Sequence, residues 1–483
     1  MRTFGIVMLA VLAAGPEANG QQPGTSPTVL LELQEAGVPH RVGVRVTVDN
    51  LPHDEYWTNT FDAIFAFADC NSDHALSEDE VRLIPSARAV RLSLGSAFTP
   101  PVASIRSLKE ILTNSSQTCS KEDLRNYYRR HGAGQLQFGY GKLPDTAAIT
   151  DALVRGLDRD QDGRLSQAEL LNAERTLRPL DTNDDELIGI GELVPNKTYP
   201  GNWATNALQP SMGIDLSPTG DRSLTLKLIP ISARVASPGS AVANDRRSET
   251  NEPALGDSVE NALWKIDISD QVHNSPLKVA TNACCESWSI HGPLTGHFAR
   301  LREEIADAEG AAPNVATENG SRNRRSSREW LTPLVDRDRD GQASQAEIDR
   351  WLALQRQLIH GQLLISVYHG GGLFELLDAN HDAGLSVREL RAAWQTLKSA
   401  GCTSEGHVEV GRIPNVVFFV ASQGFPGSLA RPSLSGAKWF RLMDRNADGD
   451  VSRREFTGSP EAFQRLDQDR DNLISSDEAA TGP

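Results

Sequence analysis

Residues 158–169 read DRDQDGRLSQAE, with aspartate at the first, third and fifth positions, glycine at the sixth and glutamate at the twelfth. Six further stretches of twelve residues repeat the pattern, beginning at Asp69, Asp181, Asp336, Asp378, Asp444 and Asp467. Each has Asp at position 1, Asp or Asn at position 3, Asp at position 5 and Glu at position 12. We name each stretch by its first residue, so that loop 158 is residues 158–169. No other pattern in the chain is as specific.

The spacing of these residues suits a hard divalent cation. An ion such as Ca²⁺ takes about six to eight oxygen ligands in a flexible shell. A tightly curled loop supplies them from the side chains at positions 1, 3 and 5, the backbone carbonyl at position 7 and both oxygens of a glutamate at position 12. The predicted ligand side chains are Asp69, Asn71, Asp73, Glu80, Asp158, Asp160, Asp162, Glu169, Asp181, Asn183, Asp185, Glu192, Asp336, Asp338, Asp340, Glu347, Asp378, Asn380, Asp382, Glu389, Asp444, Asn446, Asp448, Glu455, Asp467, Asp469, Asp471 and Glu478.

The array resembles the EF-hand family, in which a helix, a twelve-residue loop of this kind and a second helix form one unit. The resemblance covers residues 61–193 and 329–479, and within the family it is closest to secreted, bacterial-type proteins with many hands. It implies bound calcium and loops that work in twos, joined by a short β-bridge through position 8. Applied to this chain, the bridges would join Leu76 with Cys119, Leu165 with Ile188, Ala343 with Leu385 and Val451 with Ile474.

Position 6 ranks the loops by expected strength, because this position needs a left-handed backbone. Gly163, Gly341 and Gly449 satisfy the requirement, and Asn472 tolerates it. The residues at this position in loops 69, 181 and 378 are His, Glu and Ala, for which a left-handed conformation costs about 1–2 kcal/mol. We therefore expect loops 158, 336, 444 and 467 to be the strongest sites.

The loops are regularly spaced, which indicates an internal repeat. Loop 181 begins 23 residues after loop 158, loop 467 begins 23 after loop 444, and loop 378 begins 42 after loop 336. A partner for loop 69 is then expected at residues 112–123, where Asn114, Ser116, Ser120 and Asp123 remain but Leu112 replaces the first carboxylate. We interpret this stretch as an eighth hand that has lost, or nearly lost, its ion.

Alternating apolar residues predict strands as well as helices. Val42, Val44, Val46 and Val48 alternate with other residues, and similar runs occur at 224–228, 264–268, 363–368 and 416–421. The predicted fold is α+β, with paired EF-hand helix–loop–helix units in two halves and a β-containing central segment. The expected divisions are a strand segment at 21–60, a first half at 61–200, a central segment with linker at 201–328, a pair at 329–400, a strand-containing connector at 401–440 and a last pair at 441–483.

The first residues and the net charge bear on the compartment. Residues 1–20 contain one Arg, an apolar run and a small-residue cleavage pattern, which predicts a signal peptide and export to the periplasm or the extracellular space. No stretch is long and apolar enough to span a membrane. The formal net charge is −16, which disfavours nucleic acid as a partner, and seven bound calcium ions would bring the chain close to neutrality.

Two other classes of function remain open. A calcium-stiffened adhesion or assembly module would bind an unidentified protein or surface partner. A calcium-dependent hydrolase would place its site in the central segment, where His291 and His297 follow Glu286, although the chain has none of the usual HExxH, GxSxG or phosphate-binding motifs. Cys70 and Cys119 lie in the first expected pair and could form a disulfide, or Cys119 could be a buried apolar residue. The expectation is an exported calcium-binding protein without catalysis, with about seven loops in which calcium is mainly structural or buffering.

Overall fold

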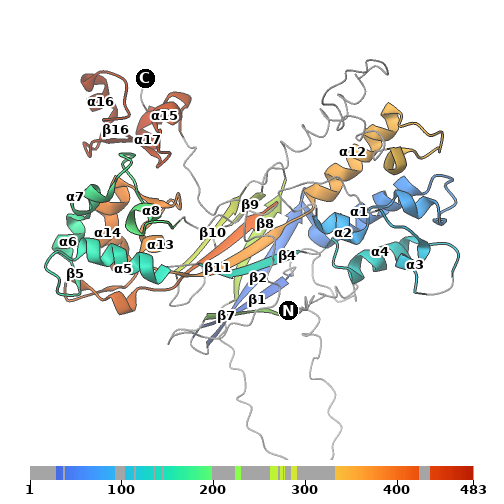
Figure 1. The fold of residues 1–483 in the computed structure, drawn as a ribbon, viewed down its shortest axis with the longest axis horizontal. Helices are drawn as coiled ribbons and strands as arrows, with labels where there is room; N and C mark the ends of the chain where they lie inside the picture. Colours follow the sequence, from blue (N-terminus) through green and yellow to red (C-terminus); the bar gives the residue numbers. More distant parts are fainter. Residues whose placement is uncertain are drawn as a thin grey trace, which may run out of the picture.

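The computed structural model describes residues 29–35, 38–92, 104–113, 116–134, 136–143, 146–197, 224–229, 261–269, 272–275, 277, 284–290, 332–423 and 436–481. The expected signal peptide, Asn114, His291 and His297 lie outside these residues. Two β-sheets occupy the centre of the molecule, and helix–loop–helix units lie at both ends of the sheets (Figure 1). None of the helices in the described ranges has the length and apolar composition needed to cross a membrane.

The two largest sheets of the described residues lie at the centre, and three small ones join loops of the helical units. The larger has the order β7-β1-β2-β8-β9, with β3 also paired to β2, and the smaller has the order β10-β15-β11-β4. The bounds of the first sheet are β1 (Val29–Glu35), β2 (Val38–Val48), β3 (Leu51–Pro52), β7 (Leu224–Ile229), β8 (Asn261–Ile268) and β9 (Val272–Asn274). Those of the second are β4 (Gln137–Lys142), β10 (Cys284–Ile290), β11 (Leu364–Gly371) and β15 (Val416–Ser422). Every run for which we predicted a strand contains one.

Side-chain alternation determines how the sheets are covered. Val42, Val44, Val46 and Val48 of β2 are buried and face a core shared with the second sheet. In this core Trp264 of β8 meets Phe419 of β15 edge to face, with 5.8 Å between ring centroids. The neighbouring residues Phe418 and Val420 of β15 point to the opposite side and join a second core with helical units. All residues of β15 are buried, as expected of a strand covered on both faces.

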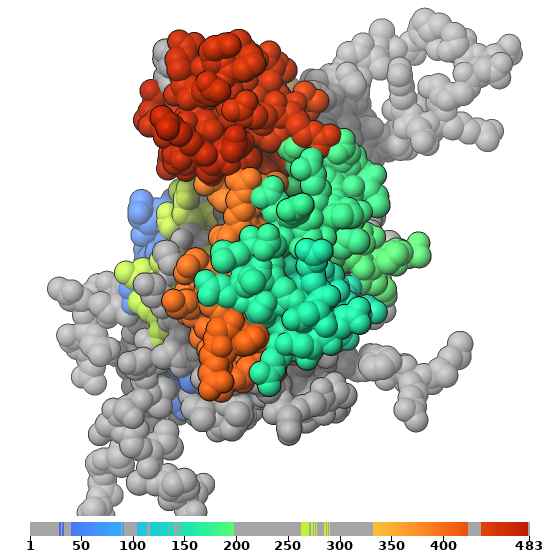
Figure 2. Space-filling model, turned by 90° about the vertical axis from the view of Figure 1, so that its left-hand side faces the viewer, coloured from blue at the N-terminus to red at the C-terminus, as the bar shows by residue number. Residues whose placement is uncertain are grey.

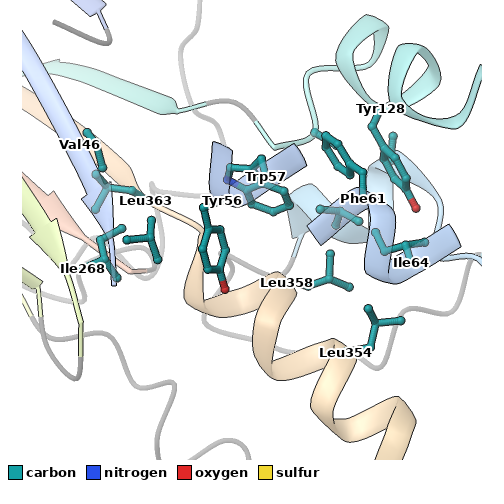
Figure 3. Packing of buried hydrophobic residues seen from close by; sticks show 14 of the residues in the cluster. Val46, Tyr56, Trp57, Phe61, Ile64, Tyr128, Ile268, Leu354, Leu358 and Leu363 are labelled. Atoms are coloured by element: carbon teal, nitrogen blue, oxygen red, sulfur yellow. The ribbon is translucent and has the colours of Figure 1, made fainter. Parts of the chain in front are cut away.

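One helical unit, here called the α12 module, contains loop 69, residues 112–123 and loop 336. Its helices are α1 (His53–Ala68), η1 (Glu80–Leu83), α2 (Ala87–Leu92), α3 (Leu108–Ile111), α4 (Lys121–Arg130) and α12 (Gln345–His360). Figure 3 shows α1 between α4 and α12: Phe61 stacks on Tyr128 with 4.8 Å between ring centroids, and Tyr56 and Ile64 lie toward Leu358. The Tyr56 hydroxyl donates to the Gln357 carbonyl at 2.8 Å, so a helix from the first half packs on one from the second.

The second unit, the α14 module, contains loops 158, 181 and 378. Its elements are α5 (Thr146–Leu157), β5 (Leu165–Ser166), α6 (Gln167–Leu171), α7 (Ala173–Leu177), η2 (Arg178–Leu180), β6 (Ile188–Gly189), α8 (Ile190–Leu193), α13 (Leu373–Leu377), β12 (Gly384–Leu385), α14 (Val387–Ser399), β13 (Thr403–Ser404), β14 (His407–Val408) and η4 (Val410–Arg412). The C-terminal pair, with loops 444 and 467, consists of α15 (Lys438–Met443), β16 (Asp450–Ser452), α16 (Pro460–Leu466), β17 (Leu473–Ser475) and α17 (Ser476–Thr481).

Two of the four expected bridges are confirmed. Leu76 and Cys119 exchange backbone hydrogen bonds of 2.9 Å in each direction, and Val451 lies opposite Ile474 between β16 and β17. Pro460 begins α16 and Ser459 caps it, accepting a bond from the Ala462 N–H at 3.2 Å, which is the turn chemistry expected between two closely spaced loops.

The other two expected bridges are wrong, because the partners come from different halves of the chain. Ile188 pairs with Leu385, and Leu165 pairs with Val408. Between loops 158 and 181, helical residues continue from α6 through α7 and η2, with Asn172 as the one break. Such a stretch is about 20 Å long if straight, at 1.5 Å per residue, so it holds the two loops apart. The corresponding stretch of the C-terminal pair contains Gly458 and Pro460 and turns back.

Candidate metal sites

All seven acidic loops have the same backbone. Positions 4 and 6 are left-handed in every loop, although only three of the seven have glycine at position 6. The position 6 residues, with φ from 63° to 92°, are His74, Gly163, Glu186, Gly341, Ala383, Gly449 and Asn472. The loops that depart from glycine at this position therefore adopt the conformation that we expected them to disfavour.

A shared set of hydrogen bonds draws the acidic side chains inward. The N–H of position 6 donates to Oδ2 of the aspartate at position 1, at 3.0–3.2 Å in all seven loops. The N–H of position 7 donates to Oδ1 of the aspartate at position 5, at 2.7–2.9 Å. Local backbone geometry thus orients two of the predicted ligands in each loop before any ion is considered.

The glutamate at position 12 closes each loop. Its Oε1 accepts from the N–H of position 2 at 2.7–3.0 Å. Its Oε2 accepts from the N–H of position 9 at 2.8–3.0 Å. Where position 9 is serine, the hydroxyl of that serine caps the following helix in loops 158, 336 and 378. The same residues therefore start the second helix and bring both carboxylate oxygens of the glutamate to the loop.

Within the described ranges, three sets of carboxylates offer one oxygen each within 4.8 Å of one another. They are Asp158, Asp160 and Glu169; Asp336, Asp338 and Glu347; and Asp467, Asp469 and Glu478. These are the three loops with aspartate rather than asparagine at position 3, so that the third ligand of the other four loops would be an amide oxygen. All three belong to the loops expected to be strongest.

At position 1 of three loops, a buried carboxylate oxygen has no hydrogen-bond partner. These oxygens are the Oδ1 atoms of Asp336, Asp444 and Asp467. In the other four loops the corresponding oxygen accepts from the N–H of position 5 at 3.1–3.2 Å. A buried carboxylate oxygen without a partner is costly, and a cation at the loop centre would supply one. The residues present therefore fit a bound divalent ion.

The loops differ in their electrostatics because they differ in burial. Burial raises the pKa of Asp444 to about 6 and that of Asp448 to about 8, and it raises the pKa of Asp378 well above its ordinary value. In the exposed loop 158, burial also raises the pKa of Glu169, but hydrogen bonds from Ser166 and from backbone N–H groups lower it overall. Neighbouring carboxylates add to the increase for Asp378, so these groups repel one another without a cation.

In the eighth hand, the described residues keep the helix cap and the bridge to loop 69, while Leu112 stands where the first carboxylate would be. Ser120 and Asp123 form a capping box at the start of α4, and Cys119 forms the bridge to loop 69. Leu112, in place of the first carboxylate, packs against the apolar core. Cys70 and Cys119 are both free thiols, so the possible disulfide between them is absent. The bridge gives this hand a structural role beside loop 69.

The sequence analysis missed a second hand-like segment, at residues 401–412. Val408 pairs with Leu165 of loop 158 in the way that position 8 of a neighbouring loop would. Glu405 and Gly406, at φ 50° and 80°, form the turn of a β-hairpin between β13 and β14. The segment begins 23 residues after Asp378, and the same interval separates loops 158 and 181, so the spacing was an available signal. The absence of aspartates concealed it.

Comparison with known proteins identifies one part of the chain. The family model of the EF hand matches residues 437–457 and 461–478, which cover loops 444 and 467. No curated protein and no solved structure matches the chain. The match supports EF-hand membership and bound calcium for the C-terminal pair. The two loops of this pair have the same set of hydrogen bonds as the other five loops.

Proposed function

We propose that this chain, whose residues 437–478 match the EF hand, is an exported calcium-binding protein that holds ions in seven loops. The observation that carries the proposal is the group of unpartnered buried oxygens on Asp336, Asp444 and Asp467. Two of these residues belong to loops in the matched segment, and the third lies in the α12 module, about a hundred residues away in the sequence. The shared hydrogen-bond set extends the proposal to the remaining loops.

The role proposed for calcium is structural. The helices that follow loops 69, 158 and 181 are short: η1 has four residues, α6 five and α8 four. Sensor hands need longer helices that change their angle when calcium binds. Ions that bind only the folded chain stabilise it by mass action and relieve the repulsion between loop carboxylates. Export would expose the loops to calcium near millimolar, which fills even weak sites.

Native mass spectrometry of residues 21–483, first with a chelator and then with Ca²⁺, tests the proposal. We expect uptake of seven ions and an increase in melting temperature. Glu347→Gln should lower the count by one, because position 12 supplies two of the oxygens. Glu55→Gln, which changes an exposed glutamate of α1 outside any loop, should leave the count unchanged. Uptake of no ions would contradict calcium binding; uptake limited to loops 444 and 467 would contradict the extension to seven.

A further inference from the structure

The C-terminal pair has its own small apolar core. Its buried apolar residues are Phe440, Val451, Phe463, Ile474 and Ala479, and they form a cluster separate from the two larger cores. Figure 2 shows the pair seated on the α14 module, above residues of loops 181 and 378. Hydrogen bonds and ion pairs join the pair to the α14 module.

Two asparagine amides join loop 444 to loops 181 and 378. Nδ2 of Asn380, at position 3 of loop 378, donates to the Asp448 carbonyl of loop 444 at 3.0 Å. Nδ2 of Asn446, at position 3 of loop 444, donates to the Asp185 carbonyl of loop 181 at 2.9 Å. Loops 181 and 378 are themselves paired through β6 and β12. The three loops thus form a closed ring of direct contacts.

The connection needs a hydrogen-bond donor at position 3. Oδ1 of Asn446 accepts from the Asp448 N–H inside its own loop at 3.2 Å, while Nδ2 donates both to Oδ2 of Asp448 at 3.2 Å and to the Asp185 carbonyl of loop 181. An aspartate at position 3 has no N–H to donate. All four asparagines at position 3 donate to the aspartate at position 5 of their own loop, at 2.7–3.2 Å. Asn380 and Asn446 donate in addition to a carbonyl of another loop, whereas the bonds given for the Asn71 and Asn183 amides stay within their own loops.

Arginine ion pairs surround the ring. Arg388 of α14 binds Asp450 of loop 444 through two bonds of 2.7 and 2.9 Å, and Arg454 pairs with Asp184 of loop 181. These two cations face nine ligand carboxylates in the three loops. Without metal the acidic groups of the contact outnumber its cations, so the contact is electrostatically unfavourable when the loops are empty.

Resting on the proposed function, we infer that loops 181, 378 and 444 bind calcium as one cooperative unit through the amides of Asn380 and Asn446, and that loading of this unit keeps the C-terminal pair docked on the α14 module. Binding in any one of the three loops orders a position 3 side chain or a carbonyl that another loop contacts. The coupling is reciprocal. If calcium in one loop changes the calcium affinity of a second loop by some factor, calcium in the second loop changes the affinity of the first by the same factor.

Matched Asn→Asp substitutions test the inference in the full chain. Asn446→Asp and Asn380→Asp keep an oxygen ligand at position 3, as in loops 158, 336 and 467, but remove the donor. We expect calcium titration calorimetry to show roughly tenfold weaker binding for several ions, in line with a lost hydrogen bond and an added charge near a carbonyl. Asn71→Asp makes the same chemical change in the α12 module and should leave the binding of all other ions unchanged.

Hydrogen exchange in saturating calcium locates the effect. In Asn446→Asp, the amides of residues 184–190 should lose protection although loop 181 is unaltered, and in Asn71→Asp they should not. If the loss of protection stays within residues 444–455, or if Asn446→Asp titrates like the wild type, the coupling is refuted while calcium binding stands. If the wild type takes up no ions by mass spectrometry, the proposed function fails and the inference with it.

Discussion

Position 6 of each loop illustrates how backbone conformation and residue type interact. The left-handed conformation is imposed by the hydrogen bond from position 6 to the first aspartate, and it holds for histidine, glutamate and alanine as well as glycine. The other hydrogen bonds of the loop offset the free-energy cost of this conformation, because together they hold the backbone in one shape. Residue type at this position therefore affects affinity rather than shape.

Gly163→Ala isolates this cost. A Cβ at Gly163 meets nothing within 4 Å, so the penalty is backbone strain alone at φ +80°. We expect about 1–2 kcal/mol, which is roughly tenfold weaker calcium binding at loop 158. Gly411→Ala, also with open space around the added Cβ but without a positive φ, is the control and should bind like the wild type. Calcium titration measures both, and equal affinities would contradict a strain cost.

His53 gives the folded chain a dependence on pH. Burial lowers the pKa of His53 to about 4, and its Nε2 lies 3.2 Å from the Gly361 carbonyl. Because the unfolded chain binds this proton near pH 6.5, the stabilisation is complete above pH 6.5 and is lost as the pH falls toward 4.

Urea unfolding of the wild type and of His53→Asn measures the effect. Between pH 7.5 and pH 4 the wild type should lose roughly 3 kcal/mol more than the variant, from about 2.5 units of pKa difference. The carboxylates are the same in both proteins, so the difference between the two stability losses cancels their contribution and leaves that of His53. Parallel loss of stability in the two proteins would show that His53 titrates normally.

The helices and strands follow from local sequence, but their pairing does not. Alternating valines sufficed to predict β2, and the aspartate spacing sufficed to predict each loop and the helix that follows Ser344 or Ser386. The bridge between Ile188 and Leu385 joins residues almost two hundred positions apart, and position 8 is apolar in most loops, so nothing local selects the partner. The missed signal lies between loops 158 and 181, where the stretch lacks the Gly458 and Pro460 of the C-terminal pair and stays helical except at Asn172.

A double-mutant cycle tests the bridge that joins the two halves. Ile188 and Leu385 are buried and opposite each other, so Ile188→Ala and Leu385→Ala should each cost about 2–5 kcal/mol of stability. Their effects should differ from additivity by about 0.5–3 kcal/mol, as is usual for residues in contact. Ile188→Ala combined with Leu76→Ala, in the α12 module, should be additive. Additive behaviour of the first pair would contradict the bridge.

The molecule as a whole is held together by contacts between distant parts of the chain. β2 pairs with β8, β4 with β11 and β6 with β12, and each of these joins a strand before residue 200 to one after residue 260. The predicted organisation in two halves described the sequence repeat, whereas the strands of both halves share the two sheets. Spacing along the chain could not predict this. Apolar and polar residues alternate in the same way in every strand, so the alternation identifies a strand but does not select its partner.

Cutting the chain tests this arrangement. Co-expressed residues 21–256 and 257–483 should elute as one species in size exclusion, with or without a chelator, because the sheets hold them together. A cut at residue 432 separates the C-terminal pair, and that piece should leave the larger one when calcium is removed, because loading of loops 181, 378 and 444 is inferred to keep it docked. Separate elution of 21–256 and 257–483 in calcium would contradict the shared sheets.

β4 and β11 each run from the α12 module to the α14 module, side by side and parallel. A strand cannot slip by one residue without turning every buried side chain to the wrong face. The α12 module therefore cannot move the α14 module by sliding a strand, nor the reverse. The sheets keep a conformational change at one end of the molecule from reaching the other. Depletion of calcium should then proceed in two separate steps, each end reporting only on its own ions.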